Sequence, residues 1–271
     1  MNKGSIFILI LSLSFVFSCE SPKVKEEILP EVRAVFPSSD TLPENLLRMY
    51  IHFSKPMKTI GNLEKIQLLD EQGKEVVGAI FNNVHELWDK EQRKLSLIFD
   101  PSRVKTGLKA NEERGRPLEA GRHYKLFIGL LEDFQSKKLK EVFTKSFYVR
   151  EEDRIAPNTA NWSIKTPIAN SRSPLIVQFP EMLDQLSLLQ RLQVTDTDNQ
   201  AIQGKVTITN QEREWHFMPT EKWSSADYIL YVHSRLEDPS GNNLNGLFDH
   251  KIGTLKNERE GEVESILLKI E

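Results

Sequence analysis

The sequence predicts an all-β protein that consists of two consecutive antiparallel β-sandwiches. Apolar and polar residues alternate in many short segments, and Gly, Pro, Asn and Asp separate these segments. A period of two places one set of side chains on a buried face and the other towards solvent, as in a half-buried strand. The same series of segments occurs twice along the 271 residues. Short strands at regular spacing, with turns between them, are typical of sandwiches.

The segment 47–57 is the clearest part of the repeat, and residues 175–182 are its second copy. Both copies alternate as far as a phenylalanine, Phe53 or Phe179, and a proline follows. Proline ends a strand because it cannot donate to a β-ladder. A second strand and a polar turn come next, with an aspartate at the same distance from the phenylalanine in both copies. A repeat this long indicates two domains of one type rather than a solenoid of small units.

The repeat gives the expected domain boundaries. Residues 31–150 form the first domain and residues 158–254 form the second. A short charged segment with a proline, residues 151–157, links them. Residues 255–271 form a C-terminal tail in which 264–270 is strand-like and is a possible extra strand of the second domain.

The apolar residues of the alternating segments are the predicted core. Each lies on the inward phase of its strand, so that two sheets can interdigitate there. They are Met49, Ile51, Phe53, Leu95, Leu97, Phe99, Leu126 and Ile128 in the first domain, and Val177, Phe179, Trp215, Phe217, Leu230 and Val232 in the second. The first domain also contains two insertions, of which the polar one within residues 102–120 is expected to be a surface loop.

Residues 1–19 have the features of a bacterial lipoprotein signal peptide. Lys3 provides a basic start, and the apolar run from Ile6 to Phe17 is too short for a stable membrane anchor. The end of this segment, Val16-Phe17-Ser18-Cys19, resembles the lipobox, in which a small residue precedes the cysteine that becomes lipidated. Since Cys19 is the only cysteine, the mature protein would begin there and hold no disulfide. An ordinary secretory signal with an incidental cysteine is the alternative.

A lipidated Cys19 would make the membrane the first partner of this protein. Acyl chains on one cysteine bury enough methylene groups for stable anchoring. Residues 20–30 are charged, contain proline and lack aromatic residues, so we expect a disordered tether between the membrane and the first domain. The expected location is the outer membrane, on either its periplasmic face or the cell surface.

The landmarks of the strands resemble the bacterial Ig-like domain of S-layer and other cell-surface proteins. In the first domain these landmarks are Phe53-Ser54-Lys55-Pro56, Asp70-Glu71-Gln72-Gly73, Phe99-Asp100-Pro101 and Gly121-Arg122-His123-Tyr124. The second domain has Asp238-Pro239-Ser240-Gly241-Asn242. The resemblance covers residues 31–254 and implies modules that space, display or bind, with no catalytic residues. Tyr124 and Tyr228 also resemble the tyrosine corner, in which a phenol bonds back to nearby backbone.

The composition argues against nucleic-acid binding, metal binding and cofactor binding. The net charge is −3, and the chain has no basic block. The turns at 196–199 and 238–243 contain Asp and Asn, but neither fits the twelve-residue calcium loop, and turns favour these residues anyway. The six histidines are scattered, and no pair has metal-ligand spacing. We therefore expect no metal site and no cofactor.

Motifs of catalysis are present only as short coincidences. Ser102-Arg103-Val104-Lys105 and Lys105-Thr106-Gly107 both match motifs of penicillin-binding enzymes. In those enzymes the two motifs lie on separate elements, whereas here they share one lysine in one loop. The acidic pairs Glu132-Asp133 and Glu237-Asp238 are adjacent residues, which do not face one cleft from a strand. We expect no catalytic residue.

Three aromatic residues are candidates for contacts with a partner. Trp88 lies in the first insertion, where it either caps a hairpin or contacts a partner. Phe127 and Tyr231 lie on the strand phase opposite to the core, so we expect one of them to contact the neighbouring domain or the linker, with partner binding as the alternative. The expected function is a non-catalytic envelope lipoprotein that binds an envelope protein or glycan, or acts as a spacer. The alternative is a carbohydrate-binding or accessory enzyme lipoprotein that uses loops of the first domain.

The lipobox predicts that Cys19→Ala abolishes membrane attachment. Cell fractionation should then find the protein in the soluble fraction, and a fatty-acid analogue should no longer label it, because the acylated residue is missing. Ser18→Ala, which keeps a small residue before the cysteine, is the matched control and should stay attached. Unchanged labelling of Cys19→Ala would rule out the lipoprotein assignment.

Overall fold

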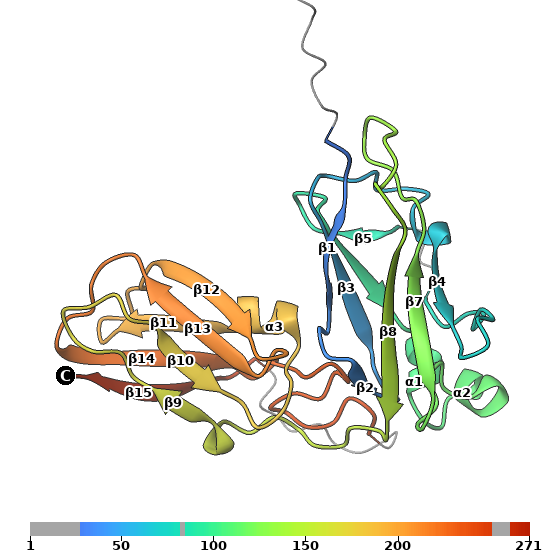
Figure 1. The fold of residues 1–271 in the computed structure, drawn as a ribbon. Coiled ribbons are helices and arrows are strands. Elements are labelled where there is room, and N and C mark those ends of the chain that lie inside the picture. Colours follow the sequence, from blue (N-terminus) through green and yellow to red (C-terminus); the bar gives the residue numbers. More distant parts are fainter. Residues whose placement is uncertain (1–27, 82–84, 251–260) are drawn as a thin grey trace, which may run out of the picture.

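The computed structural model of this chain describes residues 28–81, 85–250 and 261–271. Within these residues the strands form two sandwiches that lie at an angle to one another, an N-terminal and a C-terminal one (Figure 1). The predicted lipidation site Cys19, most of the tether and part of the C-terminal tail lie outside the described residues.

Two sheets form the N-terminal sandwich (Figure 1). The first has the order β1 (Val32–Phe36), β3 (Arg48–Phe53), β6 (Lys94–Ile98) and β5 (Leu87–Trp88), and all its pairs are antiparallel. The second has the order β2 (Thr41–Pro43), β8 (Phe143–Arg150), β7 (His123–Ile128) and β4 (Ile66–Leu69). Its strands are antiparallel except for the β2–β8 pair, which is parallel.

The C-terminal sandwich has the same plan. Its first sheet has the order β12 (Gly204–Thr209), β13 (Glu214–Pro219), β10 (Leu175–Gln178) and β9 (Ser163–Lys165). Its second sheet has the order β11 (Leu192–Asp196), β14 (Ala226–His233) and β15 (Val263–Ile270). Strand β15 pairs with β14 along its whole length, so the C-terminal sandwich extends beyond residue 254.

The strand orders are those of an immunoglobulin-type sandwich. When the strands are lettered along the chain and the short β2, which adds to the edge of the second sheet, is left aside, β1, β3, β6 and β5 are A, B, E and D, and β4, β7 and β8 are C, F and G. The C-terminal sandwich gives A, B, E and D for β9, β10, β13 and β12, and C, F and G for β11, β14 and β15. Constant-type immunoglobulin domains pair A-B-E-D against C-F-G. The predicted all-β sandwich fold is therefore confirmed.

Each sandwich has its own hydrophobic core. Every residue of the predicted core is buried, including Trp215, which is 1% exposed. Each core also contains residues from outside the domain boundaries expected for it. Leu268 and Ile270 of β15 belong to the C-terminal core, and Met182 of the C-terminal half packs into the N-terminal core.

The two tyrosines at the start of the F strands form the predicted corners. The Tyr124 hydroxyl accepts a hydrogen bond from the Glu119 amide at 3.1 Å, and the Tyr228 hydroxyl accepts one from the Ser224 amide at 3.1 Å. Both residues are buried. Each hydrogen bond links the segment that precedes an F strand to the beginning of that strand. This is the structural role that the sequence indicates for the two tyrosines.

The described helices are short. They are η1 (Leu63–Lys65), α1 (Pro101–Val104), α2 (Lys109–Arg114), η2 (Thr159–Asn161) and α3 (Gln185–Gln190). In the described part of the chain no helix is long and apolar enough to cross a membrane. The segment 102–120 was expected to be a surface loop, but it contains α1 and α2. Helix α1 starts because Asp100 accepts a hydrogen bond from the Ser102 amide and Pro101 occupies the first helical turn.

The core packing predicts a large loss of stability for Phe53→Ala or Phe179→Ala. Phe53 is 4% exposed and lies against Trp88, and Phe179 is 5% exposed and lies against Trp162. Removal of either ring leaves a cavity in a close-packed interior, which costs about 3–5 kcal/mol of unfolding free energy. Urea denaturation measures the loss. Phe134→Ala, which removes a ring that is 55% exposed, should cost far less, and an equal cost for both variants would contradict this packing.

Candidate functional site at the junction of the sandwiches

The C-terminal sandwich covers the outward face of strand β3. Met49, Ile51 and Phe53 point into the N-terminal core, so Arg48 and Tyr50 point away from it. An outward sheet face is normally solvated. Tyr50 is nevertheless only 1% exposed, because residues of the C-terminal half lie on it.

A buried hydrogen bond joins Tyr50 to Asp184. The Tyr50 hydroxyl donates to the Asp184 carboxylate at 2.8 Å, and Asp184 is 3% exposed. The other oxygen of this carboxylate accepts from the Ser187 amide at 2.8 Å and so caps helix α3. Burial raises the pKa of Asp184 and also that of Tyr50, because both charged forms lose water. The Asp184 carboxylate therefore caps helix α3 of the C-terminal sandwich and also binds strand β3 of the N-terminal one.

Further polar contacts surround this bond. Arg48 pairs with Glu237 at 2.8 Å. Glu212 accepts hydrogen bonds from the Ser38 amide at 2.8 Å and from its hydroxyl at 2.7 Å. Glu212 is 2% exposed, and burial raises its pKa, as it also raises that of Glu237. These contacts all cross from one sandwich to the other.

The loop that follows β14 fills the junction beside β3. Asp238 accepts hydrogen bonds from the amides of Ser240 at 2.8 Å and Asn242 at 3.0 Å. The Leu47 amide donates to the Pro239 carbonyl at 2.9 Å. Gly241 has a φ of +80°, and a Cβ there would lie 2.8 Å from the Leu47 side chain, so this position strongly favours glycine.

The loop that follows helix α1 contacts Asp249, at the far end of the segment that follows β14. Asp249 is 4% exposed and accepts hydrogen bonds from the amide and hydroxyl of Thr106, at 3.1 Å and 2.9 Å. Arg116 and Arg154 lie 3.5 Å and 3.7 Å from the same carboxylate. Thr106 belongs to the Lys-Thr-Gly motif of the sequence, and the structure gives it this role in the junction.

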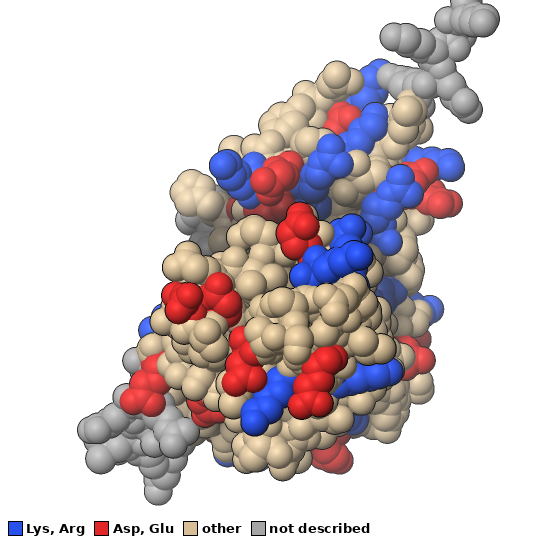
Figure 2. Space-filling model, turned by 90° about the vertical axis from the view of Figure 1, so that its left-hand side faces the viewer, with Lys and Arg blue, Asp and Glu red and all other residues tan. Residues whose placement is uncertain are grey.

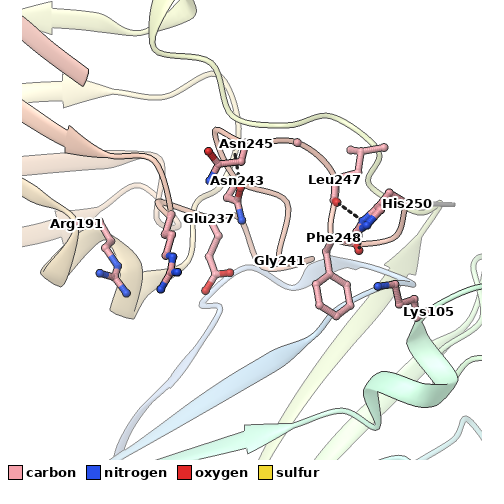
Figure 3. A pocket seen from close by; sticks show the side chains of 11 residues that line it. Lys105, Arg191, Glu237, Gly241, Asn243, Asn245, Leu247, Phe248 and His250 are labelled. Atoms are coloured by element: carbon pink, nitrogen blue, oxygen red, sulfur yellow. Dashed lines mark hydrogen bonds between the residues drawn. The ribbon is translucent and has the colours of Figure 1, made fainter. Parts of the chain in front are cut away.

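A hollow of about 250 Å³ lies between these segments. Lys105 comes from the N-terminal sandwich, and the rest of the lining comes from the C-terminal one. The lining residues are Lys105, Arg191, Arg235, Glu237, Gly241, Asn243, Asn245, Gly246, Leu247, Phe248 and His250. Figure 3 shows Lys105 beside Phe248 at one side and Arg191 and Glu237 at the other. The Lys105 ammonium lies 5.4 Å from the centre of the Phe248 ring.

The aromatic residues singled out from the sequence lie elsewhere. Trp88 packs on Phe53 with ring centres 5.6 Å apart, and its indole N–H donates to Glu86 at 2.8 Å. Tyr231 donates to Asn199 of its own sandwich at 2.6 Å. Phe127 lies in β7, opposite residues of β4 and β8. The contacts across the junction given above come from other side chains, and a partner role for Trp88, Phe127 or Tyr231 stays a prediction.

The junction residues carry no local signal in the sequence. Arg48 and Tyr50 occupy the phase that the alternation assigns to solvent, and Asp184 and Glu212 lie between strands. Of the possible metal ligands in the turns, Asp238 is used within its own turn. Among the described residues no group of three or more His, Cys, Asp or Glu is placed to hold a metal ion. The face in Figure 2 shows basic and acidic residues interspersed rather than one charged patch.

Comparisons with known proteins give distant structural likenesses. No protein-family model matches the chain, and no curated protein matches it. The S-layer protein rSbsC(31-844) matches with 10% identity and a TM-score of 0.32, over 76% of this chain and 23% of that chain. A fragment of native alpha-2-macroglobulin from Escherichia coli, spanning domains MG0-NIE-MG1, matches with 10% identity and a TM-score of 0.28, over 90% and 97%. The chain thus spans about a quarter of the S-layer protein, and the fold assignment depends on the strand orders above.

The environment of Glu181 predicts that stability falls as the pH rises. Burial, and then the nearby charge of Asp153, raise the pKa of Glu181 to about 7 from its ordinary value of 4.5, although Arg213 and Arg150 oppose this. A raised pKa in the folded state means that stability is fully present below the ordinary value and is lost as the pH rises through the folded value. Glu181→Gln should therefore remove part of the decline in unfolding free energy between about pH 5 and pH 8.

Urea denaturation at several pH values measures this effect. Glu181→Gln should be more stable than the natural protein at the upper pH and similar to it at the lower one. The control is Glu221→Gln, which neutralises an exposed carboxylate and should keep the original profile. Parallel profiles for the natural protein and Glu181→Gln would contradict the assignment.

Proposed function

We propose that this protein is a non-catalytic lipoprotein of the bacterial envelope, whose two Ig-like sandwiches form one rigid binding or structural module. The observation that carries the proposal is the buried junction. Domains in one chain usually move relative to each other unless their interface is large and hydrophobic, and in this junction buried polar contacts oppose such motion as well. Here Tyr50, Asp184 and Glu212 are each buried and hydrogen-bonded across the junction, and Met182 enters the neighbouring core. A change of orientation would leave these polar groups without partners.

The anchor part of the proposal rests on the lipobox of the sequence. An acylated Cys19 with a short tether would hold the N-terminal sandwich next to the membrane. The C-terminal sandwich would then be displayed at a constant distance and angle from the N-terminal one, and the tether would set how far both can reach from the membrane. Such a unit suits presentation of a surface to an envelope protein or glycan, at the periplasmic or outer face of the outer membrane.

A carbohydrate-binding lipoprotein is the second candidate. The hollow favours it, because a loop of the N-terminal domain contributes Lys105 and the second sandwich contributes amide side chains and Phe248. Such a mixture of polar groups and an aromatic ring is typical of small-molecule sites. Among the described lining residues the carboxylate is that of Glu237, and its pairing with Arg48 favours binding over acid–base catalysis.

Disruption of the junction tests the rigid-module proposal. The double substitution Arg48→Gln with Tyr50→Phe removes both donors of β3 while each core stays intact. Loss of the Tyr50 donor alone should cost about 1–3 kcal/mol, because Asp184 remains buried. Small-angle scattering, on protein released from the membrane by Cys19→Ala, should show a larger radius of gyration and a more flexible profile.

The control for this experiment is Arg33→Gln. Arg33 lies in the same sheet, but its side chain is 64% exposed, and it pairs with Glu31 of its own sandwich. Its scattering profile should match that of the natural protein. An unchanged profile for the double variant would show that the junction does not set the orientation, which would overturn the proposal.

A further inference from the structure

We propose that the end of the N-terminal sandwich opposite the junction rests on the lipid bilayer, with Phe134 and Ile60 inserted at the boundary between headgroups and acyl chains. This contact rests on the anchor part of the proposed function and goes beyond it, because the sandwich itself would touch the membrane. The loop that carries Phe134 connects β7 to β8, and the loop that carries Ile60 follows β3. Figure 1 shows the β7–β8 loop and the start of β1 together at this end.

The β7–β8 loop contains the same turn that the C-terminal sandwich uses for docking. Asp133 accepts hydrogen bonds from the amides two and four residues further on, both at 2.9 Å. Asp238, at the matching position after β14, does the same at 2.8 Å and 3.0 Å. That second turn lies against the N-terminal sandwich, where the Pro239 carbonyl accepts from the Leu47 amide. The residue that corresponds to Pro239 in the first turn is Phe134, whose side chain is 55% exposed.

Ile60 lies on the loop next to this turn and is 81% exposed. The residues two before and two after it, Lys58 and Asn62, both donate hydrogen bonds to the Glu132 carbonyl, at 2.9 Å and 3.0 Å. Glu132 stands two positions before Phe134, so the two apolar side chains extend from adjoining loops. Exposed apolar residues are ordinary when they are scattered, whereas a group at one end indicates a contact surface. Further exposed apolar residues at this end are Ile28, Leu130 and Val142.

The place where the described chain starts favours the bilayer as the occupant. The Lys140 amide donates to the Pro30 carbonyl at 2.9 Å, so the start of the sandwich lies beside the β7–β8 loop. Nine peptide steps separate Cys19 from Ile28, and an extended chain of that length spans at most about 32 Å. An acylated Cys19 would therefore keep this end close to lipid. Because the anchor raises the effective concentration of the loops at the bilayer, a weak insertion would be well populated.

The charges of the β7–β8 loop permit this contact. Residues 129–142 contain three lysines and three carboxylates, so their formal charges balance. Glu132 is paired with Lys58 at 2.6 Å and with Lys65 at 3.2 Å. Lys138 and Lys140 are exposed, and such side chains can keep the ammonium among phosphate groups while their stems lie on apolar surface. Apolar contact rather than net charge would therefore supply most of the affinity.

Tryptophan fluorescence in vesicles tests this contact. The mature chain, residues 19–271, keeps every described residue and is coupled through the thiol of its only cysteine to a maleimide lipid. The vesicles contain equal parts of phosphatidylcholine and phosphatidylglycerol, with and without bromine in the acyl chains. Brominated lipid should quench Phe134→Trp more than the natural protein, whose four tryptophans are not exposed. The emission maximum of the new indole should also move to shorter wavelength, because the ring leaves water.

Further variants locate the contact. Addition of Ile60→Ser to Phe134→Trp should lower the ratio of docked to undocked molecules about tenfold, because burial of one such side chain changes an equilibrium constant by about that factor. Ile168→Trp is the matched control, since it places an indole at a site that is 70% exposed in the C-terminal sandwich, and it should not be quenched beyond the natural protein. Higher salt concentration should leave the quenching of Phe134→Trp unchanged, because the charges of the loop balance.

The proposal fails on any of three results. They are quenching of Phe134→Trp no greater than that of the natural protein, equal quenching of Ile168→Trp, and quenching that Ile60→Ser leaves unchanged. A protein occupant would give the first result, and a photo-crosslinker at Gln135 would then capture that protein in intact cells. Coupling through the thiol makes the readout independent of acylation in cells, which fractionation of Cys19→Ala tests separately. The scattering of the double variant at the junction is likewise unaffected.

Discussion

The hydrogen bond between Tyr50 and Asp184 is the contact on which the arrangement of the molecule depends. It joins the outward face of β3 to the C-terminal sandwich, which buries Tyr50, and the Asp184 carboxylate also caps α3. Helix α3 ends at Gln190, and the next residue, Arg191, lines the hollow. The orientation of the sandwiches and the position of one wall of the hollow therefore have a common origin in one buried side chain.

The junction is polar, and this has a cost. Burial raises the pKa of Asp184, Glu212, Glu237 and Asp238, which means that the folded protein opposes the charge on each of them. Hydrogen bonds from Tyr50 and other donors offset this only in one geometry. Apolar contacts would tolerate sliding, whereas buried polar groups penalise every misplaced arrangement. The junction is therefore better understood as a device for orientation than as a source of stability.

The sequence was sufficient for the sandwiches and insufficient for the junction. The period of two identified residues such as Met49 and Trp215 as core, and it held because each strand has one dry face. The same pattern assigned Tyr50 to solvent, and this was wrong. The alternation within one strand cannot reveal a partner that lies 134 positions away and belongs to no strand. Helices α1 and α2 were missed because they are only four and six residues long and most of their residues are polar. The contact of the intervening Thr106 with Asp249 was missed because the two residues are far apart along the chain. Cys19 and the partner roles of Trp88, Phe127 and Tyr231 stay predictions.

The place of Met182 in the N-terminal core has a consequence for how such proteins can be divided or recombined. A fragment that ends at the linker would lose this side chain and expose the β3 face around Tyr50. The N-terminal sandwich is therefore incomplete by itself, although its own strands close into a full immunoglobulin-type pattern. Exchange of one sandwich for that of a related protein would have to transfer the junction residues of both partners together. In evolution the two sandwiches should change as a pair, with substitutions at Tyr50 accompanied by substitutions at Asp184.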